Sequence, residues 1–166
     1  MKAPRQTLDS LLVEEDFFDD SLLFALGCHL PGYTLCWWLN RLFDVNFFLD
    51  TDCNVSAKLA DKKQPKSAGS LFGQLETEER EWIVHFPVYR HERQYSEASL
   101  LLYTNHIGAT TLIPELKKAD YLLLVQNAGS VAAPEDFYLH LSKIDAVDWH
   151  SRQDMSLIKS LGDLMF

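Results

Sequence analysis

The 166-residue chain has the length of a single domain, and its 47% hydrophobic content is enough to bury a core without disulfides or metals. Its formal net charge of −9, with no basic patch interleaved with aromatic residues, argues against a nucleic-acid partner because phosphates would be repelled. The apolar runs are far shorter than the roughly 20 residues that span a bilayer, so we expect a soluble protein with no membrane partner.

The cysteines and the opening sequence bear on the cellular compartment. Cys28, Cys36 and Cys53 are odd in number and form no CxxC pair, and the first residues lack the long apolar region of a signal peptide. We therefore expect reduced thiols in a cytoplasmic protein.

The first third of the chain shows strand and helix patterns. Residues 1–20 fit either an opening strand with an acidic turn or a short helix, whereas residues 21–28 are apolar at both alternate positions, which is typical of a central strand. Residues 31–43 begin with Pro31 and predict a helix. Its apolar stripe has the spacing i, i+3, i+4, i+7 and consists of Leu35, Trp38, Leu39 and Leu42. Residues 44–50 predict a return strand or an extended segment.

The middle of the chain changes in composition. Residues 54–73 are rich in lysine and small residues and have few apolar anchors, so we expect a mobile loop within one domain. Residues 82–89 predict a strand, and Pro87 places it at a sheet edge or at a bulge because proline cannot donate to a ladder.

The second half predicts more strands. Residues 99–104 and 109–113 flank an Asn-His-Ile-Gly turn and predict a hairpin, and residues 121–126 predict a further strand. A second helix is expected to start near Pro134. Its predicted core face consists of Phe137, Leu141 and Ile144.

The tail, residues 147–166, predicts a short strand and a terminal helical turn that carries Leu157, Ile158 and Leu161. The whole order predicts an α+β protein, a single two-layer domain over residues 1–166, with a mainly antiparallel sheet and two principal helices.

The sequence lacks the usual catalytic and cofactor signatures. Glycine-rich phosphate loops, a GxSxG elbow and an HExxH pair are all missing, so we expect no cofactor. His85, His91 and His106 could approach one another and bind a metal, but their spacing is not that of known ligand sets and we expect no metal site. Cys36 lies near the predicted helix start, where a thiol can be activated, yet its apolar neighbours favour a packed side chain.

One helix face suggests a protein partner. Tyr33, Trp37 and Arg41 are spaced one helical turn apart on the predicted helix, and these residue types are common at binding hot spots. An exposed edge strand near Pro87 also invites self-pairing, so a homodimer is one form that the partner could take.

The stretch IPELKKADY resembles the signature of the IPExxxVDY family, a group of small uncharacterised proteins of Bacteroidetes-type bacteria. The matching residues are Ile113, Pro114, Glu115, Asp120 and Tyr121, and Ala119 replaces the valine of the family signature. The LPGYTLCWWLN segment resembles a second family pattern. The family has no established activity, so the resemblance implies an identity and no catalytic residues.

The motif itself has two interpretations. Pro114 and Glu115 at the start of a short turn, with Lys117 and Lys118 at its end, place each charge where a helix dipole favours it, which predicts a structural connector between strands. The alternative is an enzyme or small-ligand binder that uses Glu115 as a base with Lys117 or Lys118 and a histidine such as His106. Because no catalytic pair is evident, we expect a cytoplasmic, non-enzymatic interaction or accessory protein.

Overall fold

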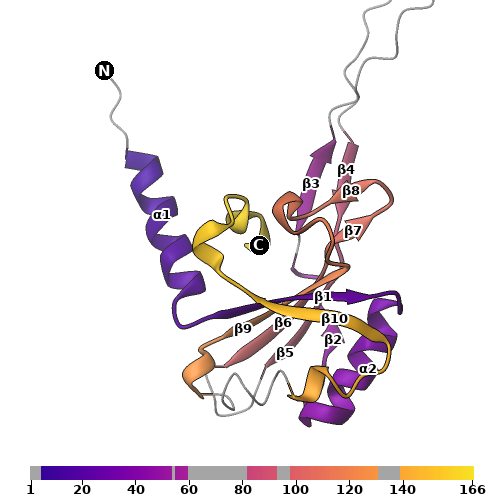
Figure 1. The fold of residues 1–166 in the computed structure, drawn as a ribbon. Helices are drawn as coiled ribbons and strands as arrows, with labels where there is room; N and C mark the ends of the chain where they lie inside the picture. The colour runs from indigo at the N-terminus through magenta and orange to yellow at the C-terminus, as the bar shows by residue number, and fades with distance from the viewer. Residues whose placement is uncertain (1–4, 54, 60–81, 93–97, 131–138) are drawn as a thin grey trace, which may run out of the picture.

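The computed structural model describes residues 5–53, 55–59, 82–92, 98–130 and 139–166. Its centre is an antiparallel six-stranded sheet with the strand order β10-β1-β9-β6-β5-β2 (Figure 1). The strands are β1 (Leu22–Cys28), β2 (Phe48–Leu49), β5 (Val88–Glu92), β6 (Ser99–Thr104), β9 (Tyr121–Gln126) and β10 (Val147–Gln153). The predicted α+β class with a mainly antiparallel sheet is confirmed.

The central strands are buried on both faces. All seven residues of β1 are buried, as the continuous apolar pattern of residues 21–28 predicts. Successive side chains point to opposite faces, so Phe24 and Leu26 join one core cluster while Leu23 and Ala25 join the other. The sheet therefore separates two apolar cores.

Helix α2 (Gly32–Phe43) covers one face, which we call the helical face. Leu35 and Leu39 of the predicted stripe are fully buried there, and the helix ends at Asp44, which has a left-handed backbone with φ of 52°. Residues 139–141 add a helical turn, and Leu141 and Ile144 pack into the same core. The predicted start of that helix near Pro134, and Phe137, lie outside the described residues.

The opposite face, the connector face, is covered mainly by connecting segments and by the chain end. The turns η3 (Met155–Leu157) and η4 (Leu161–Leu164) follow β10, and Ile158, Leu161 and Leu164 are buried in the core on this side. Helix α1 (Arg5–Phe18) adds Phe18 and the partly buried Phe17 to this core at its C-terminal end, and from there it extends away from the sheet (Figure 1). Of the two alternatives for residues 1–20, the helix is the one that forms.

The single strand predicted across Pro87 is wrong. The chain instead forms β4 (Trp82–His85), which pairs with β3 (Ser56–Leu59) in a separate two-stranded sheet, and then β5 in the main sheet. Pro87 has no N–H for a ladder, and at this point the chain passes from one sheet to the other. Strand β3 also corrects the start of the predicted loop 54–73, whose remaining residues, 54 and 60–73, lie outside the described residues.

The predicted pairing of residues 99–104 with 109–113 is also wrong. Strand β6 pairs with β5 and β9, whereas β7 (His106–Ile107) and β8 (Thr110–Thr111) form a small hairpin of their own around Gly108, whose φ is +59°. The chain leaves the main sheet at the buried Asn105, whose N–H donates to the Asp120 carbonyl at 2.9 Å. The hairpin therefore projects from the connector region instead of extending the sheet.

Candidate functional site

The IPELKKADY segment, residues 113–121, connects β8 to β9. Ile113 is fully buried with an extended backbone, and Pro114 opens the short turn η1 (Pro114–Leu116). The turn is closed by two backbone hydrogen bonds, from the Leu116 N–H to the Ile113 carbonyl at 3.0 Å and from the Ala119 N–H to the Leu116 carbonyl at 2.9 Å. The segment thus has the strand-turn-strand form that the sequence predicts.

A buried side chain outside the motif organises this turn. The Asn105 Oδ1 atom accepts from the Ile113 N–H at 2.9 Å, while its Nδ2 atom donates to the Leu116 and Ala119 carbonyls at 3.0 and 2.9 Å. The amide therefore pairs with three backbone groups of the turn, of which the Leu116 carbonyl also accepts from the Ala119 N–H. Sequence reasoning missed this role, because an asparagine before a glycine-containing turn is typical of an exposed loop.

Glu115 reaches the C-terminal part of the chain. Its Oε1 atom accepts from the backbone N–H groups of Lys159 and Ser160 at 3.0 and 3.1 Å, and its Oε2 atom accepts from the Ser160 hydroxyl at 2.6 Å. The Ser160 hydroxyl bond is the main reason that the pKa of Glu115 lies below its ordinary value. The carboxylate thereby links η1 to the residues that lead into η4.

Asp120 and Tyr121 reach the segment between β1 and α2. The Asp120 Oδ2 atom accepts from the Cys28 N–H at 2.9 Å, at the end of β1. The Tyr121 hydroxyl donates to the Leu30 carbonyl at 2.6 Å, and burial of the ring raises the pKa of Tyr121 to about 12. Three motif side chains thus contact two chain segments that are distant in sequence.

The groups proposed for catalysis with Glu115 are placed differently. Lys117 and Lys118 are exposed, and the His106 Nε2 atom lies 2.9 Å from the backbone carbonyl of Lys117. The other ring nitrogen of His106 contacts the Thr111 hydroxyl at 3.1 Å. A general base needs to face a cavity with a proton-bearing group in reach, whereas the oxygens of Glu115 accept from Lys159 and Ser160.

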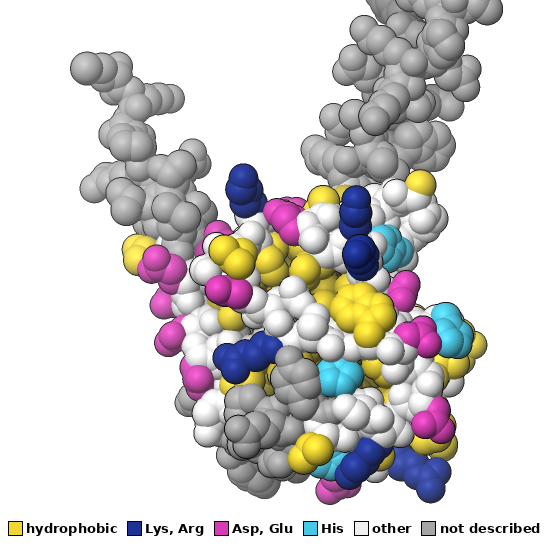
Figure 2. All heavy atoms as spheres, in the orientation of Figure 1, with side chains coloured by type: hydrophobic (Ala, Val, Ile, Leu, Met, Phe, Trp, Pro, Cys, Tyr) yellow, Lys and Arg dark blue, Asp and Glu magenta, His cyan; other side chains and the backbone are white. Residues whose placement is uncertain are grey.

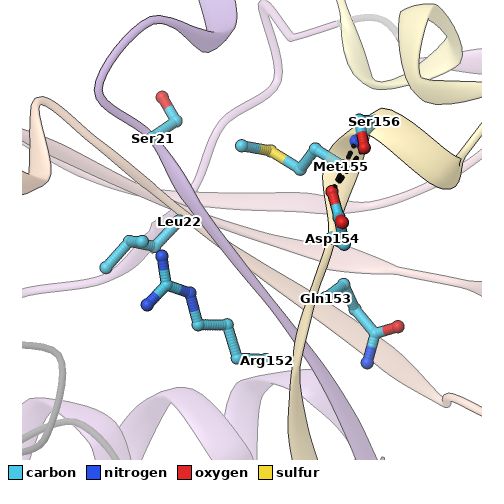
Figure 3. Close-up of a pocket in the computed structure, with 7 residues that line it drawn as sticks. All are labelled: Ser21, Leu22, Arg152, Gln153, Asp154, Met155 and Ser156. Carbon is cyan, nitrogen blue, oxygen red and sulfur yellow. Dashed lines mark hydrogen bonds between the residues drawn. The ribbon is translucent and has the colours of Figure 1, made fainter.

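Two surface hollows lie near the start of β1, and no residue of the motif lines either of them. One has a volume of about 480 Å³ and lies beside the start of β1 and the end of β10 (Figure 3). Its lining consists of Ser21, Leu22, Arg152, Gln153, Asp154, Met155 and Ser156. Asp154 accepts from the backbone and hydroxyl of Ser156 there, which makes this carboxylate the cap of η3.

The candidate partner residues share the exposed side of α2. Tyr33 is 70% exposed and Trp37 is 52% exposed. The Arg41 guanidinium carbon lies 5.5 Å from the centroid of the Trp37 ring, a cation–π distance. We call Tyr33, Trp37 and Arg41 the aromatic patch.

The thiols are buried, and their surroundings can be compared with those of reactive cysteines and metal ligands. All three cysteines are buried, and burial raises the pKa of Cys36 to about 12, which argues against a thiolate nucleophile. Within the described residues no three His, Cys, Asp or Glu side chains are grouped closely enough to hold a metal ion.

Two further observations concern membrane-spanning helices and similarity to known proteins. None of the helices in the described ranges is both long and apolar enough to span a bilayer. No protein-family model, curated protein or solved structure matches this chain.

Proposed function

We propose that this protein is a cytoplasmic, non-enzymatic interaction protein that binds a protein partner through the aromatic patch. The observation that carries the proposal is the exposure of Tyr33 and Trp37 beside Arg41 on one helix side. Tyrosine, tryptophan and arginine dominate the binding energy of many interfaces because they combine large apolar area with directed polar groups.

The patch lies on a helix that is anchored to the sheet. The opposite side of α2 is anchored by Leu35, Cys36 and Leu39, which are buried against the sheet. Little side-chain or backbone ordering would then be needed on binding, which favours affinity. The arrangement suits a partner that presents an apolar group beside a carboxylate, the first for the rings and the second for Arg41.

We also propose that residues 113–121 act as a structural joint and that the chain is a member of the IPExxxVDY family. The contacts of Glu115, Asp120 and Tyr121 with distant backbone groups support the first point. An alignment of homologues in which these three positions vary independently of one another would count against the second.

The partner proposal is tested by cross-linking in cells followed by measurement with the purified partner. Calorimetry on wild type, Trp37→Ala and Arg41→Glu should show binding weakened by about 30-fold for Trp37→Ala, the loss of about 2 kcal/mol typical of a hot spot. Leu157→Ala is the matched control, because Leu157 is another exposed apolar side chain, on η3. Equal affinity of the Trp37→Ala and Leu157→Ala variants would refute the proposal.

A further inference from the structure

Strand β2 is a short edge of the main sheet and lies beside α2 (Figure 1). The Asp50 N–H donates to the Val88 carbonyl at 2.9 Å, and Leu49 stands opposite Tyr89. In an antiparallel ladder, hydrogen-bonded pairs alternate with pairs that are not bonded, so the N–H and C=O groups of Leu49 point away from the sheet. Among the described residues neither of these two groups has a partner.

The preceding outward-pointing groups on this edge are already paired. The Phe47 N–H donates to the Asn40 Oδ1 atom at 2.7 Å, and the Phe47 carbonyl accepts from the Asn40 Nδ2 atom at 3.4 Å. The side-chain amide of Asn40, which belongs to α2, thus pairs with Phe47 in the way that a neighbouring strand would. The edge is open at Leu49, two residues further on.

The open edge borders the aromatic patch. Tyr33 and Asn40 are seven residues apart on α2, which places them on the same side of the helix, about 20° apart. Since Asn40 bonds to the chain just before β2, this side of the helix faces the edge. At the start of α2, a Cβ atom on Gly32 would lie 2.7 Å from the Tyr89 ring, and Tyr89 stands opposite Leu49.

Exposed apolar side chains flank the open backbone groups. Leu49 is 52% exposed and Phe48 is 50% exposed, and the two side chains point to opposite faces of the strand. Leu49 shares the helical face with Tyr89, so it lies on the side of the sheet that α2 covers. Where α2 lies, apolar and basic side chains are both exposed (Figure 2). An extended peptide can satisfy the backbone groups and the apolar side chains together, whereas the backbone groups of a helix are bonded within the helix.

We propose that the partner of the aromatic patch binds as an extended segment that pairs with the N–H and C=O groups of Leu49 and places alternate side chains against Leu49 and Tyr33. This rests on the proposed function of the patch and adds the conformation of the bound segment. A carboxylate in the segment complements Arg41. The two backbone hydrogen bonds fix the direction and register of the segment, while the aromatic side chains supply most of the binding energy.

Random linear peptides are a probe that does not require the natural partner. Phage selection on the immobilised full chain should enrich peptides with apolar residues at alternate positions and an acidic residue. Calorimetry with one enriched, synthesised peptide should show binding weakened about 30-fold by Trp37→Ala, as for a hot spot, and about tenfold by Leu49→Pro, which removes one hydrogen-bond donor. Proline is tolerated at edge positions whose N–H faces solvent, and circular dichroism and thermal melting establish that the variant is folded. Leu49→Ala keeps the N–H and should weaken binding less than Leu49→Pro.

Amide hydrogen exchange separates this proposal from that of the aromatic patch. The bound peptide should slow exchange at the Leu49 N–H by about tenfold, the value of one hydrogen bond, and should leave the Phe47 N–H, already bonded to Asn40, at its free rate. Binding that Trp37→Ala weakens, without protection of the Leu49 N–H, would overturn the extended segment and leave the patch as the binding site. Protection of Leu49 with unchanged affinity for Trp37→Ala would overturn the patch instead. Selection that yields no peptide able to bind wild type would also overturn the extended segment.

Discussion

At the scale of single residues, polar side chains around the motif bond mainly to backbone groups of other segments. Asn105 satisfies three backbone groups, and Glu115 satisfies two amides and a hydroxyl. The sequence places charges and an asparagine correctly in turns, but it does not reveal which distant backbone groups they reach. Residue type predicts that a polar group needs a partner, whereas only the fold supplies that partner.

Asn105→Ala should lower the free energy of unfolding by about 3 kcal/mol, because the buried Ile113 N–H and the Ala119 carbonyl lose the side-chain partner and the Leu116 carbonyl loses one of its two donors. Urea unfolding monitored by circular dichroism measures this change. Asn46→Ala is the matched control. Asn46 is exposed and contacts His91 through its backbone, so the effect should stay within about 0.5 kcal/mol. Equal effects of the two changes would contradict the assigned role.

The lowered pKa of Glu115 predicts a pH dependence of stability. A carboxyl with a depressed pKa in the folded state contributes stability above its ordinary value of 4.5, and this contribution is lost as the pH falls through the folded-state pKa. The advantage of wild type over Glu115→Gln should therefore be constant near neutral pH and decline below pH 4.5.

Ser160→Ala removes the hydroxyl that contributes most to this pKa shift. In that background the decline with acid should be smaller and should end at a higher pH, because the folded-state pKa of Glu115 then lies closer to its ordinary value. Thermal melts of wild type, Glu115→Gln, Ser160→Ala and the double variant between neutral pH and acid measure how the contribution of Glu115 to stability changes with pH. If the advantage of wild type over Glu115→Gln does not change with pH, the assigned interaction is ruled out.

At the scale of elements, the predictions that held are those for segments with a clear hydrophobic period and sufficient length. Residues 121–126 and 99–104 are strands with the predicted bounds, and α2 lies within one residue of the predicted start, because burial enforces their patterns. Pairing partners were harder to predict. The hairpin around Gly108 and the strand change at Pro87 depend on which long-range partners the flanking residues find.

The contact between β1 and β10 depends on a glycine. A Cβ atom on Gly27 would lie 2.0 Å from the Trp149 Nε1 atom, so the indole occupies the space that any side chain would need. Gly27→Ala should cost about 2 kcal/mol of stability through overpacking.

A double-mutant cycle isolates this contact. In a Trp149→Ala background, Gly27→Ala should cost less than about 0.5 kcal/mol because the overlapping ring is gone. Urea unfolding at the lowest practical concentration gives all four values, and additive effects would show that the ring does not occupy this position.

At the scale of the whole molecule, the sheet divides the protein into a helical face and a connector face. Composition and strand count predict the α+β class and the antiparallel sheet, since these follow from local pattern. The cover of the connector face is predicted in part. Ile158 and Leu161 of the predicted terminal turn are buried in it, whereas Leu157 is 74% exposed and the buried Leu164 lies outside the predicted set, because these short turns have no helical periodicity of their own. The motif segment contacts the connector-face turns through Glu115 and the approach to α2 through Tyr121.

The central claim is that residues 113–121 hold distant segments of one fold in place, and amide hydrogen exchange measured by NMR tests it most directly. Glu115→Ala should accelerate exchange at Lys159 and Ser160, and Asp120→Ala at Cys28, each by about tenfold, the value of one hydrogen bond. Glu115→Ala should leave exchange at Cys28 at the wild-type rate, and Asp120→Ala should leave exchange at Lys159 and Ser160 at the wild-type rate. Wild-type exchange at all three amides, together with loss of partner or ligand binding, would instead identify the motif as a binding or reactive site.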